Sequence, residues 1–182
     1  MDIVSETKLL GTILTNDLKW DRNTAAIEKK AYARMQLLRK VKSFNPPLNQ
    51  LKSVYTTFVR SVVEQSCTVW NSMITAENKE DLERIQKCAL RIILENKYKD
   101  YRTALNIMEL ATLSDRRESL CKEFARKCVT NVKTHELFQE NKKTHEMKIR
   151  NTEKYDTMFA HRERLKKSPV IYMQRLLNLE TK

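Results

Sequence analysis

Residues 21–44 read DRNTAAIEKKAYARMQLLRKVKSF, and this stretch decides the fold class. Its apolar side chains recur every three or four residues, at Ile27, Ala31, Met35, Leu38 and Val41. This period puts them on one face of an α-helix, which becomes stable when that face is buried against other elements. Asp21 is the expected N-cap. The helix is expected to end near Phe44, because Asn45-Pro46-Pro47 follows and disfavours further helical backbone.

The other faces of this helix are almost uniformly positive. Between Arg22 and Lys42 the sequence has seven basic residues and one acid, Glu28. Surface helices more often mix the two signs, whereas helices that follow a phosphate backbone carry one sign. The candidate phosphate contacts on this helix are Lys29, Lys30, Arg34, Arg39, Lys40 and Lys42. The alternative is a basic surface that confers solubility and nothing more.

A second set of candidate phosphate contacts lies further along the chain. It consists of Arg116, Arg117, Lys122, Arg126 and Lys127. Tyr32 and Tyr98 are candidates for stacking on bases, although a tyrosine at helical spacing more often packs against its own protein.

The rest of the chain also carries helical patterns. Helices are expected over residues 48–69, from the capping residue Thr75 through Ile93, from Asp100, from Ser114 to about Val132, and from Pro169. In the first of these, the apolar stripe is expected to contain Leu51, Tyr55, Phe58, Val62 and Gln65, and to be widened by Val54, Val59 and Val63 until much of the circumference is apolar. Trp20 and Trp70 stand at helix ends and are expected to be core anchors.

The two ends of the chain look different from the middle. Residues 8–14 (KLLGTIL) predict one short strand, and residues 133–167 are polar, basic and expected to be extended, with a helical turn near 136–140. One glycine and three prolines leave little turn chemistry for hairpins. The expected fold is all-α, with five to six helices, one short N-terminal strand and a basic, partly extended C-terminal segment. Residues 1–20 would form a strand and turn, 21–132 a helical domain, and 133–182 a basic tail with a terminal helix.

Composition narrows the function classes. Lys and Arg number 35 against 23 Asp and Glu, a net charge of +12 that favours a polyanionic partner. The four cysteines have neither the spacing of a disulfide scaffold nor a secretory signal before them, so an intracellular place, nucleus or cytoplasm, is expected. No run of about 18 apolar residues exists, and no membrane span is expected.

The motifs of catalysis and metal binding are missing from the sequence. No serine is flanked by glycines, and a single glycine cannot build a phosphate-cradling loop. Cys128, His135 and His145 do not have zinc-site spacing, and Cys121 and Cys128 are expected to be small core residues. The carboxylates of Glu80-Asp81 and Glu83 are expected at the exposed start of a helix. No metal, no cofactor and no enzymatic activity are expected of this chain.

Several short strings, taken in order, carry a resemblance to a known family. They are KLLGTIL (8–14) followed by DLKWD (17–21), VYTTFVRSVVE (54–64), DLERIQK (81–87) with ALRII (89–93), FARK (124–127) and SPVIYM (168–173). Together they resemble the region that follows the palm in reverse transcriptases of non-LTR (LINE-type) retrotransposons, particularly the jockey-like group. The resemblance spans nearly the whole chain.

The resemblance implies a thumb and a helical C-terminal portion, which in that family grip the template–primer duplex beside the palm. The family's catalytic carboxylates lie in the fingers and palm, partly in a Tyr/Phe-x-Asp-Asp hairpin that does not occur here. No catalytic residue is therefore carried over to this chain. The chain is expected to begin where the palm would end, with Gly11 on the strand that joins palm to thumb.

The sequence thus predicts a non-catalytic chain that binds nucleic acid, RNA or DNA, through basic helices without reading its sequence. Three alternatives stay open at this point. The chain is a truncated or domesticated helical module that binds a protein partner through an exposed apolar face, or a gene-model remnant without function, or a fragment of a longer polymerase.

Overall fold

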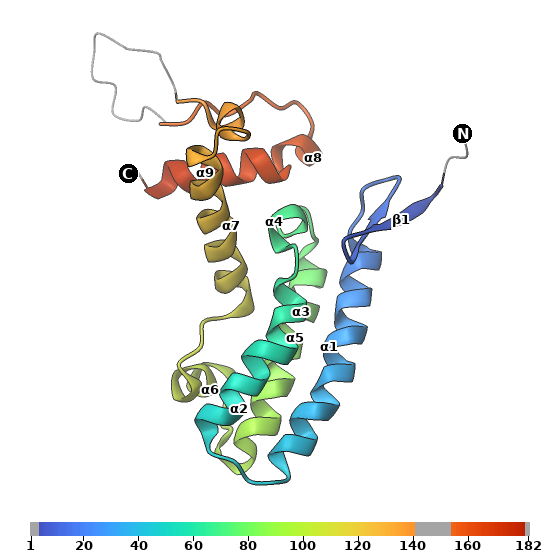
Figure 1. Ribbon diagram of the computed structural model, residues 1–182, viewed down its shortest axis with the longest axis vertical. Coiled ribbons are helices and arrows are strands. Elements are labelled where there is room, and N and C mark those ends of the chain that lie inside the picture. Colours follow the sequence, from blue (N-terminus) through green and yellow to red (C-terminus); the bar gives the residue numbers. More distant parts are fainter. Residues whose placement is uncertain (1–3, 141–153, 181–182) are drawn as a thin grey trace. The chain divides into compact units, whose positions relative to one another are not determined.

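The computed structural model describes residues 4–140 and 154–180 (Figure 1). Most of these residues are helical, and one two-stranded sheet precedes the helices. The expected all-α class is confirmed. The chain divides into two compact units. Unit 1 comprises Met1–Cys67 and Ile74–Arg117, and unit 2 comprises Thr68–Met73 and Glu118–Lys182.

Unit 1 begins with a β-hairpin where a single strand was expected. β1 (Glu6–Leu9) pairs antiparallel with β2 (Thr12–Thr15), with Leu9 opposite Thr12. Leu10 and Gly11 form the two-residue turn and have φ values of 48° and 87°. Such left-handed values at both positions give a turn whose twist matches that of the strands. The prediction of one strand over residues 8–14 was wrong because it ran through this turn, at the chain's one glycine.

The long basic helix α1 (Asp21–Lys42) follows the hairpin. Its expected apolar face is confirmed, since Ala31, Met35 and Leu38 have no exposed surface. The expected cap was wrong: Asp21 is already helical, and its carboxylate accepts a hydrogen bond of 2.7 Å from Asn78 Nδ2. α1 ends close to the expected place, before the two prolines.

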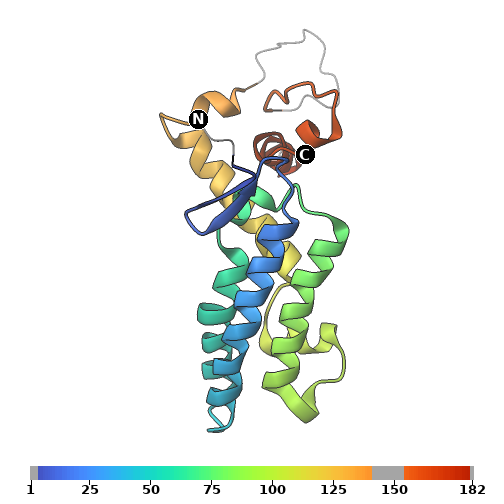
Figure 2. The same cartoon turned by 90° about the vertical axis from the view of Figure 1, so that its right-hand side faces the viewer.

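Polar contacts tie the hairpin to α1. Asn23, on the first turn of α1, accepts a 3.1 Å hydrogen bond from the backbone N–H of Ile13. Arg22 makes a 2.5 Å ion pair with Glu6. Trp20, just before α1, is buried as expected. Figure 2 shows α1 lying beside α5 (Ala76–Leu94), which is its main helical neighbour in unit 1.

The second helix contains a π-helical segment, and most of the expected apolar stripe along it is buried, including Val59 and Val63. α2 (Leu48–Val54) continues into η1 (Tyr55–Arg60), a π-helix, and then into α3 (Ser61–Glu64). The wider turns of a π-helix rotate the side chains relative to an α-helix. Tyr55 and Val59 are buried in it, whereas Phe58 is 49% exposed. The prediction that Phe58 belongs to the apolar stripe was therefore wrong.

This helix also ends before the expected Val69. Ser66 has a φ of 52°, which breaks the helix after α3, and the short α4 (Cys67–Trp70) follows. Gln65, expected on the stripe, is exposed and donates a 3.2 Å hydrogen bond to the carbonyl of Leu10 in the hairpin turn. Trp70 is fully buried, as expected of a core anchor.

Side-chain caps start the later helices. Thr75 Oγ1 accepts a hydrogen bond from the Asn78 amide at 3.1 Å at the start of α5, and the predicted cap is confirmed. After η2 (Glu95–Lys97), Asp100 accepts one from the Thr103 amide at 2.9 Å and caps α6 (Tyr101–Met108), also as predicted. At α7 (Leu113–Thr130) the predicted Ser114 cap was wrong, because the Thr112 hydroxyl accepts from the Asp115 amide at 3.0 Å instead.

A buried polar network around Gln86 connects the helices of unit 1. Its side-chain oxygen accepts from the Tyr55 hydroxyl at 2.6 Å, and its amide nitrogen donates to the Tyr101 hydroxyl at 3.0 Å and to the Ala111 carbonyl at 2.9 Å. Tyr101 in turn donates to the Glu83 carboxylate. Burial, followed by this bond, raises the pKa of Tyr101 well above its usual range.

Glu83 has a structural role that its sequence position did not indicate. Its carboxylate accepts hydrogen bonds from the first backbone amides of α7, those of Leu113 at 3.0 Å and Ser114 at 3.2 Å. A carboxylate in this place satisfies amides that have no partner within the helix. The prediction of an exposed Glu83 at the start of a helix was therefore wrong, and Glu83 fixes the start of α7 against α5.

Unit 2 has its own core, formed around the remainder of α7. It also contains η3 (His135–Phe138), α8 (Glu163–Lys166) and α9 (Pro169–Glu180), so the predicted turn near 136–140 and the predicted start at Pro169 are confirmed. The buried cluster consists of Cys121, Ala125, Cys128, Phe138, Tyr155, Met173, Leu176 and Leu177. The predicted core position of both cysteines is thus confirmed, and His145 lies outside the described residues. Asn178 closes this core by two hydrogen bonds with the backbone of Tyr155, at 2.8 Å and 3.0 Å.

Candidate nucleic-acid interface

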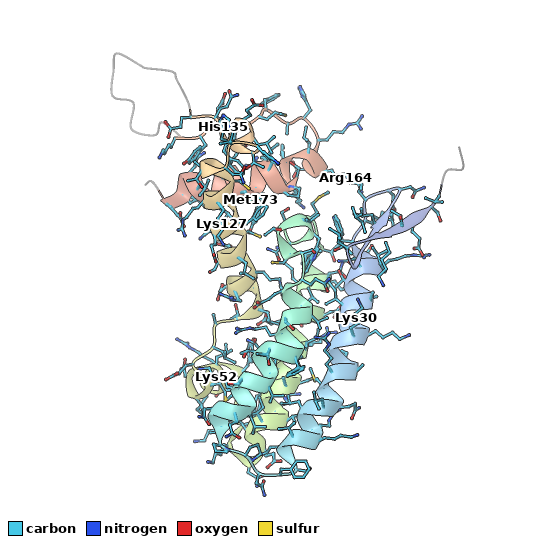
Figure 3. The ribbon with its side chains drawn as sticks, viewed as in Figure 1. Lys30, Lys52, Lys127, His135, Arg164 and Met173 are labelled. Carbon is cyan, nitrogen blue, oxygen red and sulfur yellow. The ribbon has the colours of Figure 1, made fainter. Side chains whose placement is uncertain are left out.

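Four of the six candidate cations of α1 are exposed and make no polar side-chain contact with a described residue. They are Lys29, Lys30, Arg39 and Lys40. None of the four makes an ion pair or a side-chain hydrogen bond with a described residue. Figure 3 shows Lys30 on the outer side of α1. An ammonium or guanidinium group without an acidic neighbour keeps its full attraction for a phosphate.

The other two candidates on α1 have partners within unit 1. The Arg34 guanidinium donates to the carbonyl of Phe58 at 2.7 Å and reaches the Ser61 hydroxyl at 3.5 Å. Lys42 lies 3.7 Å from the carboxylate of Glu95, and its side chain is 20% exposed. These contacts hold η1 and η2 against α1, so both cations serve the fold.

Helical geometry arranges the four free cations as a ridge with two flanks. Lys29 and Lys40 are eleven residues apart, so they lie about 16 Å apart along the axis and within roughly 20° of each other around it. Lys30 and Arg39 lie about 80–100° to either side of this line. A straight phosphate strand along α1 would contact the two ridge lysines, and a strand that curves around α1 would also reach a flank.

Four of the candidate cations on α7 differ from the four free cations on α1 because they form ion pairs with acidic side chains. All four of the exposed or partly exposed cations there are paired with acids of their own unit: Arg116 with Glu64 at 3.2 Å, Lys122 with Glu118 at 3.0 Å, Arg126 with Glu180 at 2.7 Å and Lys127 with Glu123 at 2.7 Å. Exposed pairs of this kind contribute only about 0–1 kcal/mol and can be exchanged for another anion. They nevertheless reduce the positive potential of α7 relative to α1.

Arg117 does not belong to a surface site at all. It has no exposed surface, and its position explains why. Leu113 and Cys121, which are both buried, lie four residues before and four residues after it on the same face of α7. A guanidinium with no exposed surface cannot contact a phosphate, so the structure removes Arg117 from the candidate set.

The structure adds cations that the sequence did not single out. The ion pair between Lys42 and Glu95 brings the C-terminal end of α1 to η2. The segment from η2 into α6 carries the exposed Lys97, Lys99 and Arg102. The run ENKYKDYR (95–102) was the available signal, but its proximity to α1 is a property of the fold.

The two tyrosines considered for stacking differ in availability. Tyr32 is 41% exposed, and burial of the rest raises its pKa. Tyr98 is half-buried, with the guanidinium of Arg91 lying 5.3 Å from the centre of its ring. Stacking with a cation covers one face of a ring, so Tyr32 is the better placed of the two for a base.

The described part of the chain offers no arrangement for metal chemistry. No group of three or more His, Cys, Asp or Glu among the described residues is placed to hold a metal ion. In the same residues, no helix combines the length and apolar character that crossing a membrane requires. Comparisons with protein-family models, with curated proteins and with solved structures find no significant match to this chain.

Proposed function

We propose that this chain binds nucleic acid, without reading its sequence, through the exposed cations of α1. The observation that carries the proposal is the uncompensated charge of Lys29, Lys30, Arg39 and Lys40 on one stable helix. Neutralising phosphates with such groups releases counterions, which drives association without base contacts. The chain acts as a holding element and not as a catalyst.

The substrate class that we propose is a template–primer type duplex. The support is the resemblance of the sequence to the thumb and post-thumb region of non-LTR reverse transcriptases, together with the one-signed face of α1. A thumb grips the backbone of a duplex and needs rigid cations at helical spacing, which α1 provides.

The test compares two charge-matched variants in a fluorescence anisotropy titration with a labelled duplex. The double variant Lys29→Gln, Lys40→Gln removes the ridge, and Lys122→Gln, Lys127→Gln removes the same charge from paired positions on α7. Each exposed contact is worth up to about 1 kcal/mol, so the ridge variant is expected to lose about 5- to 30-fold in affinity and the α7 variant less than about 3-fold. Equal losses would show that net charge, and not α1, determines binding.

A second candidate function is protein binding, and the hairpin supplies the observation that favours it. Leu9 is 59% exposed and Leu10, in the turn, is 88% exposed. Leu10 also has the left-handed φ of 48°, which costs a leucine energy that a small polar residue would avoid. The two adjacent exposed leucines are the part of the hairpin that would contact a partner on this reading. Sedimentation of the protein without nucleic acid tests the protein-binding function. A stable oligomer or complex that dissociates in the Leu10→Asn variant would support protein binding.

A further inference from the structure

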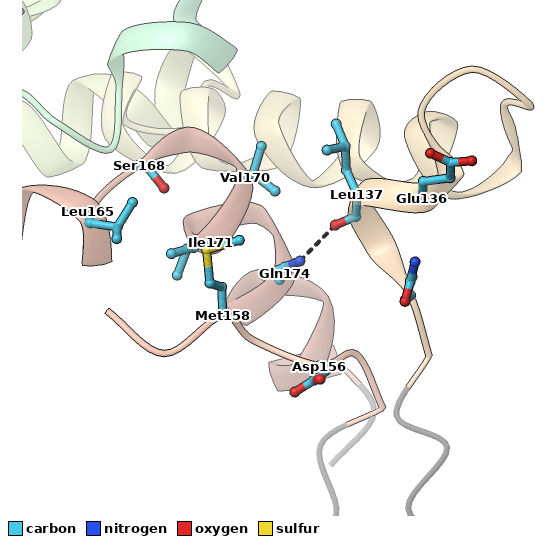
Figure 4. A pocket seen from close by; sticks show the side chains of 10 residues that line it. Glu136, Leu137, Asp156, Met158, Leu165, Ser168, Val170, Ile171 and Gln174 are labelled. Carbon is cyan, nitrogen blue, oxygen red and sulfur yellow. Dashed lines mark hydrogen bonds between the residues drawn. The ribbon is translucent and has the colours of Figure 1, made fainter. Parts of the chain in front are cut away.

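Unit 2 contains a pocket of about 500 Å³ (Figure 4). It lies between η3, residues 156–158, and the stretch from α8 into α9. Apolar side chains form most of its surface and come from Leu137, Met158, Leu165, Val170 and Ile171. A volume of this size with mostly apolar walls is typical of sites for small organic molecules.

Gln174 forms a fixed polar part of the pocket wall. Its side chain lines the pocket and is only 6% exposed. The amide nitrogen donates to the Leu137 carbonyl at 2.7 Å, which fixes the orientation of the amide group (Figure 4). The amide oxygen is buried and has no hydrogen-bond partner in the described part of the chain. This oxygen has almost no accessible surface, so a ligand in the pocket would contact other atoms of the Gln174 side chain.

The charge of the pocket is opposite to that of the chain. Glu136 and Asp156 are among its lining residues, and neither forms an ion pair with a described residue. None of the described residues that line the pocket is basic. The chain as a whole carries a net charge of +12, so two carboxylates that pair with no described residue are an unusual feature at the edge of a mostly apolar pocket.

We propose that this pocket binds a small amphipathic amine, whose apolar body lies against the apolar lining residues and whose ammonium group meets a carboxylate at the pocket edge. Apolar walls select the body of such a molecule, and the two carboxylates select its charge. A neutral molecule of the same shape would lose the charge-assisted contacts, and an anion would be repelled. The site is independent of the nucleic-acid face on α1, because its lining residues belong to unit 2.

The test uses three probes of one shape: 3-phenylpropylamine, 3-phenylpropan-1-ol and 3-phenylpropanoic acid, titrated into the full chain by calorimetry or by NMR. The amine is expected to bind about 10-fold more tightly than the alcohol, and the acid more weakly than both. The variant Glu136→Gln, Asp156→Asn should bring the amine to the affinity of the alcohol. The control Glu77→Gln, Asp115→Asn removes two exposed carboxylates from unit 1 and should leave the amine unaffected.

A second variant tests whether the probes occupy this cavity. Val170 is half-buried in the pocket wall, so Val170→Trp is expected to fill the space and reduce binding of all three probes at least 10-fold. Circular dichroism of each variant checks that the helices are retained. Equal binding of amine and acid, an unchanged amine affinity in the rim variant, or full binding to a folded Val170→Trp protein would each overturn the proposal.

Discussion

Replacing Gln86 by leucine should be among the most damaging single changes in unit 1. Gln86 is fully buried and makes three side-chain hydrogen bonds, to Tyr55, Tyr101 and the Ala111 carbonyl. Gln86→Leu keeps a similar volume but leaves the Tyr55 hydroxyl and the Ala111 carbonyl without this partner. Each buried polar group left without a hydrogen-bond partner costs about 1–3 kcal/mol, so the free energy of unfolding should fall by about 2–5 kcal/mol.

A double-mutant cycle with Tyr55→Phe isolates the network from simple packing. In the Gln86→Leu background, Tyr55→Phe removes an orphaned hydroxyl and is expected to recover about 1–2 kcal/mol. In the wild-type background the same change removes a satisfied bond and should destabilise. Urea unfolding followed by circular dichroism measures all four proteins. A Gln86→Leu protein within about 0.5 kcal/mol of the wild type, or a Tyr55→Phe change with the same sign in both backgrounds, would refute this account of the core.

Three further predictions concern a turn, a cap and a buried charge. Gly11→Ala places a Cβ at a φ of 87° and 2.5 Å from Gln65 Nε2. The stability of the hairpin, measured by amide hydrogen exchange, should therefore fall by about 1–3 kcal/mol. The loss should be smaller when Gln65→Ala is also present, because the close contact is then removed. Hydrogen bonds from the Thr103 hydroxyl and amide hold the pKa of Asp100 below its ordinary value of about 3.9. The stability that the Asp100 cap contributes is therefore complete at pH values above the ordinary pKa, and it is lost as the pH falls through the lowered pKa. Stability should therefore fall more between about pH 5 and pH 3 in the wild type than in Asp100→Asn, which caps without titrating, and parallel pH profiles would contradict this. Arg117→Gln should lower the thermal midpoint while leaving duplex affinity within about 2-fold, because Arg117 is buried, and an affinity loss in the folded variant would return Arg117 to the interface.

The helical part of the fold was predictable because its signals are local. The period of apolar residues in α1 depends on side chains three or four positions apart, and the two prolines after it act on adjacent backbone. The caps Thr75 and Asp100 act within three residues of themselves. Features of a helix that depend on residues within one turn of each other can therefore be predicted from the sequence.

The parts that were missed depend on backbone geometry or on neighbours remote in the chain. The hairpin needs left-handed backbone at Leu10, a residue type that gives no indication of it. The π-helix η1 shifts the buried face by a change of register, which exposes Phe58 although its spacing matches an α-helical stripe. Glu83 meets the amides of α7 across thirty positions of sequence, a contact that no local pattern records.

The candidate site was predictable in kind but not in its members. Charge patterning pointed to α1, and four of its six candidates are exposed with neither an ion pair nor a side-chain hydrogen bond to a described residue. It could not distinguish these from Arg34, which bonds a carbonyl of η1, because that carbonyl is 24 residues away. The position of Arg117 between Leu113 and Cys121 was a usable signal, since an i, i+4, i+8 series with apolar ends lies on one helix face.

The salt dependence of duplex binding tests the central claim most directly. The observed association constant falls with salt by about 0.9 logarithmic units for each phosphate neutralised. If α1 supplies the contacts, changing Lys29, Lys30, Arg39 and Lys40 to glutamine should flatten the slope of log K against log salt by about 2 to 4 units. Glutamine at Lys122 and Lys127 should change the slope by less than about 1 unit. A steep slope that persists in the four-residue variant, or a folded wild-type protein that binds no duplex in dilute buffer, would contradict the account.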